Sequence, residues 1–209
     1  MTARFYRIVF LLVLITGLQA GLAACVSSPP AGRVAVDTYE HLEALALDVA
    51  AVEIRDQYTP PMAAPFVEHR MINPPYSAAY NMMSHAFESV GANDVIELHI
   101  IEASIQETQI EDYPTGFRLW QKQRAKKYDG RLVVEAVLKR SVPPYSTLGQ
   151  ATVTAQRSLT AAENLSLSER EQAINSMMEN MVHDLRQGLM SVFDEKFGVL
   201  LAKPVITSP

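Results

Sequence analysis

The chain has 209 residues, of which 48% are hydrophobic and 20% charged, a composition that supports one packed domain and argues against wholesale disorder. Its 18 Lys and Arg residues against 23 Asp and Glu give a net charge of -5, which argues against a nucleic-acid binder. The single cysteine excludes an intramolecular disulfide framework and a multi-cysteine zinc or iron–sulfur site.

The first 24 residues have the three parts of a secretory signal peptide. Arg4 and Arg7 form the positive start, residues 8–15 are an apolar run, and the segment closes with Leu22-Ala23-Ala24-Cys25. The apolar run is far shorter than the roughly 18–20 residues that span a bilayer. The closing tetrapeptide resembles the lipobox of bacterial lipoproteins, which implies a lipid on Cys25 as the first mature residue. The alternatives are an ordinary signal with a chance cysteine and an uncleaved anchor.

Cleavage before Cys25 changes the charge of the chain. Residues 1–24 carry two arginines and no acid, so the mature chain has 16 basic and 23 acidic residues, a net charge of -7. Residues 25–40 are small, polar and Pro-rich, and predict a lipidated cysteine with a flexible tether. Val26 stands where an aspartate favours inner-membrane retention in enteric lipoproteins, so the sequence favours the outer membrane.

The mature domain begins with a strand, a loop and a helix. Residues 47–58 predict the strand, and the Pro-rich residues 60–65 predict the loop. Asn73-Pro74-Pro75 marks the start of the helix, and Gly91 marks its end. Apolar residues recur every three or four positions between these limits and predict one buried helix face: Tyr76, Ala79, Tyr80, Met83, Phe87 and Val90.

A long strand follows the helix. Residues 94–110 alternate apolar and polar side chains over their first half, which predicts a strand with one buried face. Ala103 and Ile105 break this alternation, because both fall on the parity of the earlier polar residues. The break predicts a β-bulge near Ile101–Glu102.

A hairpin and a long helix complete the domain. Residues 132–139 and 149–159 predict two strands joined by a short Pro-containing turn. Ser166-Leu167-Ser168-Glu169 has the capping-box form that begins a helix. An apolar stripe extends this helix from Ser168 to Phe197, with Gly188 inside it as a weak point.

These elements predict an α+β fold with the order β-α-β-β-β-α. We expect a mixed sheet of about four strands with two helices on one face, the last helix being long. If the first two strands are neighbours, they are parallel, since a helix connects them. The predicted organisation is a lipoprotein signal peptide over residues 1–24, a tether over 25–40 and a single periplasmic domain over 41–209.

No residue pattern in the domain predicts a catalytic, cofactor or metal site. The five histidines lack metal-ligand spacing, and His99 is predicted on the outward side of a strand. The acids between Glu97 and Asp112 fit a solvated strand face better than a catalytic pair. Six methionines fall on the two helices and fit either core packing or a lipid or partner groove: Met82, Met83, Met177, Met178, Met181 and Met190.

One segment of this acidic chain is strongly basic. Residues 117–128 contain five basic side chains and no acid, interleaved with aromatic residues. Such a segment contacts anionic headgroups, docks on an acidic protein surface, or is a plain solvated connection. The residues that would make a membrane or partner contact are Phe117, Arg118, Trp120, Lys122, Arg124, Lys126 and Lys127.

The lipobox, short tether and element order together resemble small envelope lipoproteins, and most nearly the auxiliary lipoproteins of ABC-type systems that transport lipids between membranes. This resemblance implies a non-catalytic partner of a membrane complex. We expect an anchored, periplasm-facing protein that is not an enzyme, needs no cofactor, and binds a lipid or an envelope protein but no nucleic acid. The alternatives are a periplasmic enzyme whose site forms only in three dimensions and a purely structural lipoprotein.

Overall fold

The computed structural model describes residues 39, 42–113 and 123–201, without the side chains of 111–113, 123 and 124. The chain divides into two units, Met1–Arg33 and Val34–Pro209, and every described residue belongs to the second. Cys25 and the predicted signal peptide therefore lie outside the described residues. None of the helices in the described part of the chain is both long and apolar enough to cross a bilayer.

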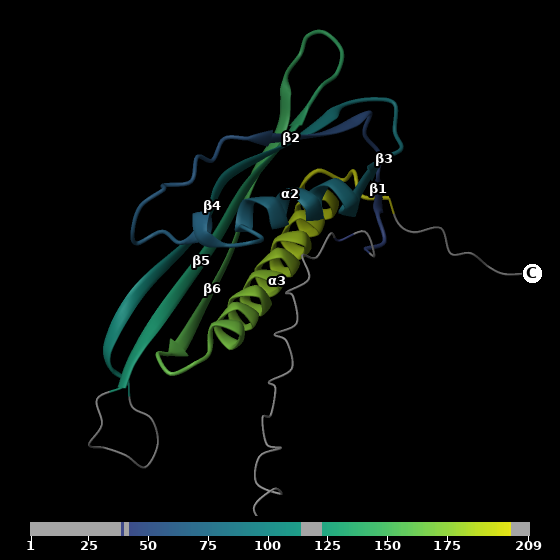
Figure 1. Cartoon of the computed structure of the whole chain (residues 1–209). Helices are drawn as coiled ribbons and strands as arrows, with labels where there is room; N and C mark the ends of the chain where they lie inside the picture. Colours follow the sequence, from purple (N-terminus) through teal and green to yellow (C-terminus); the bar gives the residue numbers. More distant parts are fainter. Residues whose placement is uncertain (1–38, 40–41, 114–122, 202–209) are drawn as a thin grey trace, which may run out of the picture. The chain divides into compact units, whose positions relative to one another are not determined.

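The main sheet has four strands in the order β2-β4-β5-β6 (Figure 1). β2 pairs in parallel with β4, whereas the β4–β5 and β5–β6 pairs are antiparallel, so the predicted mixed sheet and hairpin are confirmed. Residues 48–50 split the predicted first strand into β1 (Leu45–Leu47) and β2, and β1 pairs with β3 (Phe87–Ser89) in a separate small sheet. The bounds of the main strands are β2 (Ala51–Asp56), β4 (Val95–Tyr113), β5 (Gln123–Lys139) and β6 (Thr147–Ala162).

The first helix is shorter than predicted. α2 (Pro75–Ala86) starts with proline at its first position as expected, but the chain becomes extended at Phe87. Residues Phe87–Ser89 form β3, which pairs in parallel with β1 (Leu45–Leu47). The Phe87 ring packs edge-on against the Phe193 ring at 4.9 Å, a contact that fixes Phe87 in the extended conformation. A short 3-10 turn, η1 (Glu68–Arg70), precedes α2.

The last helix is α3 (Leu167–Ser191), which continues as a short π-helix, η2 (Val192–Lys196). Ser166 and Glu169 form the predicted capping box: the Ser166 hydroxyl accepts from the Glu169 N–H, and the Glu169 carboxylate accepts from the Ser166 N–H. The long final helix is therefore confirmed, and most of its buried residues are the predicted apolar stripe.

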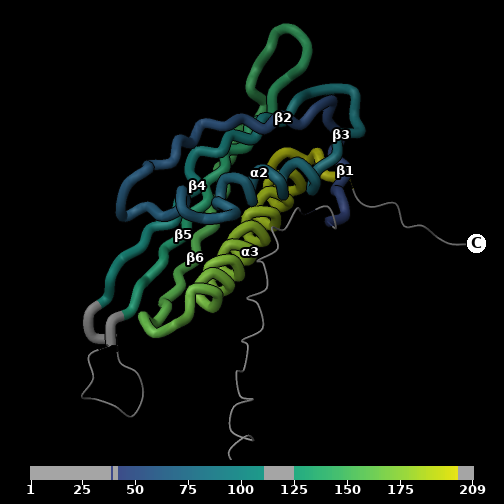
Figure 2. Tube along the Cα trace, viewed as in Figure 1, coloured from purple at the N-terminus to yellow at the C-terminus, as the bar shows by residue number. Residues whose placement is uncertain are grey.

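Both helices cover the same face of the sheet (Figures 1 and 2). The buried side chains of β4 change parity across the register shift between Ile100 and Glu102, which confirms the predicted bulge. The core lies between this face and the helices, and it includes the fully buried Leu98, Ile105 and Leu132. Glu97, which alternates with Leu98, lies on the opposite, polar face.

Two glycines bring α3 close to the sheet. A Cβ atom on Gly130 of β5 would lie 2.5 Å from the Met181 Sδ atom, and one on Gly188 of α3 would lie 2.4 Å from a Val153 methyl group. Neither distance is compatible with a side chain at the glycine unless the neighbour moves. Gly188 is therefore a site of helix–sheet contact. This contact explains why the helix has a glycine at a position where helix propensity alone disfavours it.

Candidate binding pocket

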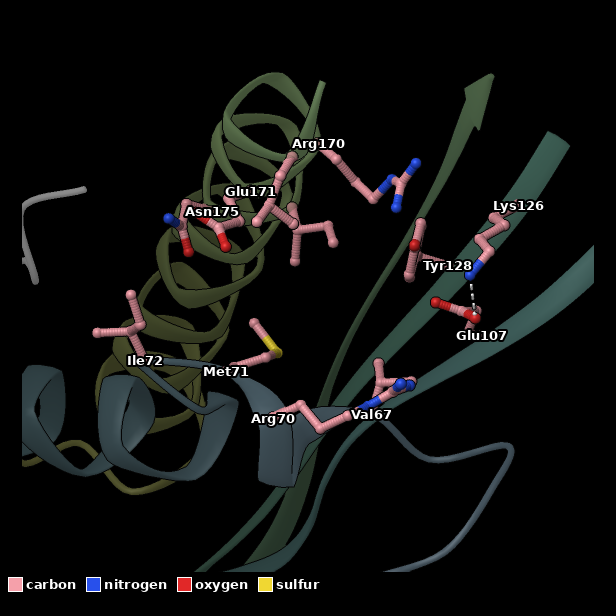
Figure 3. Close-up of a pocket in the computed structure, with 12 residues that line it drawn as sticks. Val67, Arg70, Met71, Ile72, Glu107, Lys126, Tyr128, Arg170, Glu171 and Asn175 are labelled. Carbon is pink, nitrogen blue, oxygen red and sulfur yellow. Dashed lines mark hydrogen bonds and ion pairs between the residues drawn. The ribbon is translucent and has the colours of Figure 1, made fainter. Parts of the chain in front are cut away.

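A pocket of about 230 Å³ opens at the end of the sheet where β4 ends and β5 begins (Figure 3). The first turns of α3 form one wall, the η1 turn and the residues after it form another, and β4 and β5 form the floor. The apolar lining comes from α3, from β5 and from the residues around η1: Val67, Met71, Ile72, Tyr128, Leu167 and Ile174. Ile72 and Leu167 are among the most exposed large hydrophobic residues of the described chain, and they give the pocket an apolar rim.

Three basic side chains line the same pocket from three separate elements. Arg70 comes from η1, Lys126 from β5 and Arg170 from the first turn of α3. Glu107 and Glu171 are the acidic residues of the lining, so the pocket carries one net positive charge in a chain whose overall charge is -5. Lys126 Nζ lies 2.8 Å from Glu107 Oε1, as the dashed line in Figure 3 marks.

The Arg170 guanidinium is incompletely satisfied. Its Nε atom is buried without a hydrogen-bond partner in the described part of the chain, and its Nη2 atom donates only a long bond of 3.5 Å to the Glu163 carbonyl. A buried donor without a partner carries a desolvation cost of about 1–3 kcal/mol. The Nε atom is closed to solvent, so a ligand oxygen would bond to it only after the side chain moves.

Tyr128 and Glu107 form the polar part of the floor. Burial, and then a hydrogen bond to Glu107, raise the pKa of Tyr128 to about 12, so the phenol is neutral at physiological pH. Burial would raise the pKa of Glu107, but hydrogen bonds from Lys126 and Tyr128 and the charges of Lys126 and Arg70 outweigh it and lower that pKa. Glu107 is therefore an ionised partner that neutralises Lys126 and leaves the two arginines to attract an anion.

A second polar cluster lies on the helix-free face of the sheet. The Glu97 carboxylate accepts from Lys139 Nζ at 2.6 Å and contacts His99 Nε2 at 3.0 Å, while Gln57 Nε2 lies 2.6 Å from His99 Nδ1. The hydrogen bond from Lys139 is the main cause that lowers the pKa of Glu97. This network places His99 on the outward face, as predicted, with hydrogen-bond partners at both ring nitrogens.

The structure separates the predicted basic-aromatic residues. Phe117, Arg118, Trp120 and Lys122 lie outside the described residues, as does the side chain of Arg124. The connection is shorter than predicted, because β4 extends to Tyr113 and β5 begins at Gln123. Lys126 lines the pocket, whereas the adjacent Lys127 pairs with Asp129 at 2.7 Å.

Sequence reasoning identified Lys126 but not its basic partners in the pocket. Arg70 and Arg170 are 100 positions apart, and neither stands in a basic or aromatic cluster. The one local sign was the position of Arg170 in the first turn of a helix that the capping box had already predicted.

The helix methionines belong to the core. Met82, Met83, Met177, Met178 and Met181 are buried, and Met190 packs against the same cluster while partly exposed. They do not line the pocket of Figure 3, to which only Met71 contributes a thioether. Of the two alternatives that the sequence left open, core packing is correct for these residues.

Comparisons with known proteins add little to this site. No family model matches the chain, and no curated protein matches it. Solved structures similar to it include a minor lipoprotein from Acinetobacter baumannii (15% identity, 78% of this chain and 99% of that one, TM-score 0.37). Another is the rare lipoprotein B from Shewanella oneidensis (13% identity, 71% of this chain and 97% of that one, TM-score 0.38). Similarities of this size carry no argument about function.

Among the described residues, no group of three or more histidines, cysteines or acids is placed to hold a metal ion. What the geometry provides is an apolar pocket with basic side chains on three sides. Such a site can hold the apolar part of a ligand by burial and its anionic part by charge-assisted hydrogen bonds.

Proposed function

We propose that the protein is a bacterial envelope lipoprotein, anchored through acyl chains on Cys25, whose domain is a non-enzymatic binding component of an envelope complex. We further propose that the pocket of Figure 3 binds an amphiphile with an anionic head group. Lipid transport, the activity implied by the resemblance to the auxiliary lipoproteins of ABC-type systems, is one process in which such a component would act.

The anchor rests on the sequence. Cys25 is the only thiol of the chain and ends the tetrapeptide Leu22-Ala23-Ala24-Cys25. Burial of acyl chains contributes about 0.8 kcal/mol per CH₂, so two or more chains hold a protein stably on a membrane. Val26 favours the outer membrane, with the domain facing the periplasm.

The binding role rests on one observation: three basic side chains from separate elements surround an apolar pocket. Among the described residues, no carboxylate is bonded to Arg70 or Arg170, whereas Lys126 donates to Glu107. At about 230 Å³ the pocket is smaller than the roughly 300–1,000 Å³ of sites that enclose a whole small molecule. We therefore expect it to hold part of a lipid, one acyl chain or the region around the head group.

The test is photo-crosslinking in living bacteria. A photoreactive amino acid replaces Ile72 on the pocket rim, and in a matched strain it replaces Met62, which is as exposed but does not line the pocket. After irradiation, the protein is purified and mass spectrometry identifies any lipid attached to it. The proposal predicts anionic lipid adducts from Ile72 that exceed those from Met62. Equal adducts from both positions would contradict it.

The anchor is tested in the same preparation. The mature N-terminal peptide should begin at Cys25 and carry the mass of added acyl chains. Cys25→Ser should leave an unprocessed or mislocalised precursor, because the thiol is the atom that would accept the lipid. An unmodified Cys25 in protein from the native envelope would refute the anchor without touching the pocket.

A further inference from the structure

An apolar tip projects at the other end of the sheet. The turn between β5 and β6 exposes Val142 by 55% and Tyr145 by 75%, and Leu148 at the start of β6 is 42% exposed. The tip is held in place at its base, because the Arg140 N–H donates to the Ser146 carbonyl at 2.9 Å. Figure 1 shows this hairpin extending past the ends of the other strands. An ordered turn with three exposed apolar side chains is a contact surface.

The charge around the tip differs from that of the whole chain. Residues 136–162, which contain the tip and all of β6, have three basic side chains and no acid. Lys139 pairs with Glu97 and Arg157 with Asp184, whereas Arg140, which stands directly before the turn, forms no ion pair within the described residues. The mature chain has a net charge of -7, so this hairpin is a region that an anionic surface would not repel.

The described chain begins within reach of this tip. Tyr39 lies in a pocket whose walls include Arg186, in the C-terminal half of α3. From Arg186 the helix rises about 15 Å to Phe197, whose ring lies against Gly149 at the base of the hairpin. Tyr145 is four residues further along, about 13 Å in an extended strand. The path from Tyr39 to the tip, measured along α3 to Phe197 and then along the hairpin, is therefore about 30 Å.

The tether is long enough for this distance. Thirteen residues separate Cys25 from Tyr39, and they reach about 45 Å when fully extended. A membrane that holds Cys25 is therefore accessible to the tip. Strand β5 separates Tyr128 in the pocket from Arg140 at the tip by 12 residues, or about 40 Å.

We propose that the hairpin tip docks on the membrane that carries the Cys25 anchor, an inference that rests on the proposed lipidation. Val142 and Leu148 enter the apolar boundary, Tyr145 lies at the interface where tyrosine is favoured, and Arg140 contacts head-group phosphates. The consequence is an orientation: the binding pocket faces away from the anchoring membrane, about 40 Å into the periplasm.

The test uses full-length lipidated protein in vesicles and a single tryptophan at the tip. Trp120→Phe removes the native indole, and Tyr145→Trp then places one at the tip. The matched control is Met62→Trp in the same background, because Met62 is also 75% exposed but belongs to the loop whose end pairs with β4 near the pocket. Each variant is compared in phosphatidylglycerol vesicles with and without bromine on the acyl chains, after its thermal midpoint has been checked.

The proposal predicts that bromine reduces the emission of the Tyr145→Trp protein and leaves that of the Met62→Trp protein unchanged. Adding Val142→Ser and Leu148→Ser to the Tyr145→Trp protein should restore the lost emission. Co-flotation with the vesicles, measured on the same samples, reports the anchor separately. Protein that fails to float refutes the lipidation. Protein that floats with equal emission in both vesicles refutes the docking of the tip and leaves the anchor standing.

Discussion

Substitution of Gly188 by alanine separates two opposing effects on α3. Helix propensity alone favours alanine over glycine by about 1 kcal/mol. Packing in the structure disfavours alanine at position 188, because the new methyl group would lie 2.4 Å from Val153 Cγ1. Val153 is buried on β6, and its branched side chain has little rotamer freedom, so the contact cannot be relieved by a simple rotation.

Overpacking of a core by one methyl group costs about 1–3 kcal/mol. After the gain in propensity, we expect Gly188→Ala to lower the free energy of unfolding by about 1 kcal/mol. In a Val153→Ala background the methyl group has space, so the same substitution should become stabilising by up to about 1 kcal/mol. The change of sign is the quantity that the structure predicts.

The assay is urea denaturation of the four proteins of this double-mutant cycle, followed by far-UV circular dichroism. A coupling energy of about 2 kcal/mol between positions 188 and 153 would support the close approach of α3 to β6. If Gly188→Ala stabilises both backgrounds equally, the helix does not contact the sheet at this position. The packing described above would then be wrong.

Three further predictions test the core, the polar face and the connection between β4 and β5. Leu185→Asp places an unpaired charge at a fully buried position and should remove about 4 kcal/mol or more of stability in thermal unfolding; an unchanged midpoint would mean that the stripe is exposed. Glu97 has a lowered pKa through Lys139, so its stabilisation exists above the unfolded-state pKa and disappears as pH falls through the folded one. Glu97→Gln should therefore cost about 1 kcal/mol at pH 7 in urea titrations, and this cost should shrink as the pH falls below the unfolded-state pKa of about 4.3 and disappear only below the lower folded-state pKa. If residues 117–128 recognise an anionic surface, replacing three of their basic residues by glutamine should weaken binding of the unlipidated domain to anionic vesicles mainly at low salt, and Trp120→Ala should weaken it at every salt concentration; no change in either variant would make the segment a plain connection.

Local patterns in the sequence predicted the elements whose cause is local. The capping box at Ser166 needs only two side chains three residues apart, and the bulge after Ile100 follows from a change of parity along one strand. The end of α2 was not predictable in this way. Phe87 is compatible with the helical pattern and becomes extended because it packs against Phe193, more than 100 residues later.

The candidate site depends still more on long-range contacts. Glu107 falls within the predicted strand 94–110, whereas Lys126 falls in the segment that the sequence predicts as a connection. Lys126 is a strand residue because β4 and β5 pair there, and its side chain bonds to Glu107 on the neighbouring strand. Arg70 and Arg170 join them only through the packing of η1 and α3 against that end of the sheet.

The central claim is that the pocket recognises an anionic amphiphile, and adjacent lysines provide the most direct test. Lys126 lines the pocket, whereas Lys127 pairs with Asp129 away from it. Lipidated protein in phosphatidylcholine nanodiscs is titrated with dioctanoyl phosphatidylglycerol, with empty nanodiscs as the blank, and binding is measured by calorimetry. We predict that Arg170→Gln weakens the affinity by about tenfold, because it removes a positive charge from the lining. Lys126→Gln should weaken it by a similar factor, because Glu107 is then left without its cation beside the anion, while Lys127→Gln leaves the affinity unchanged. Equal affinities for all four proteins, or equal effects of the two lysine variants, would contradict a binding site in this pocket.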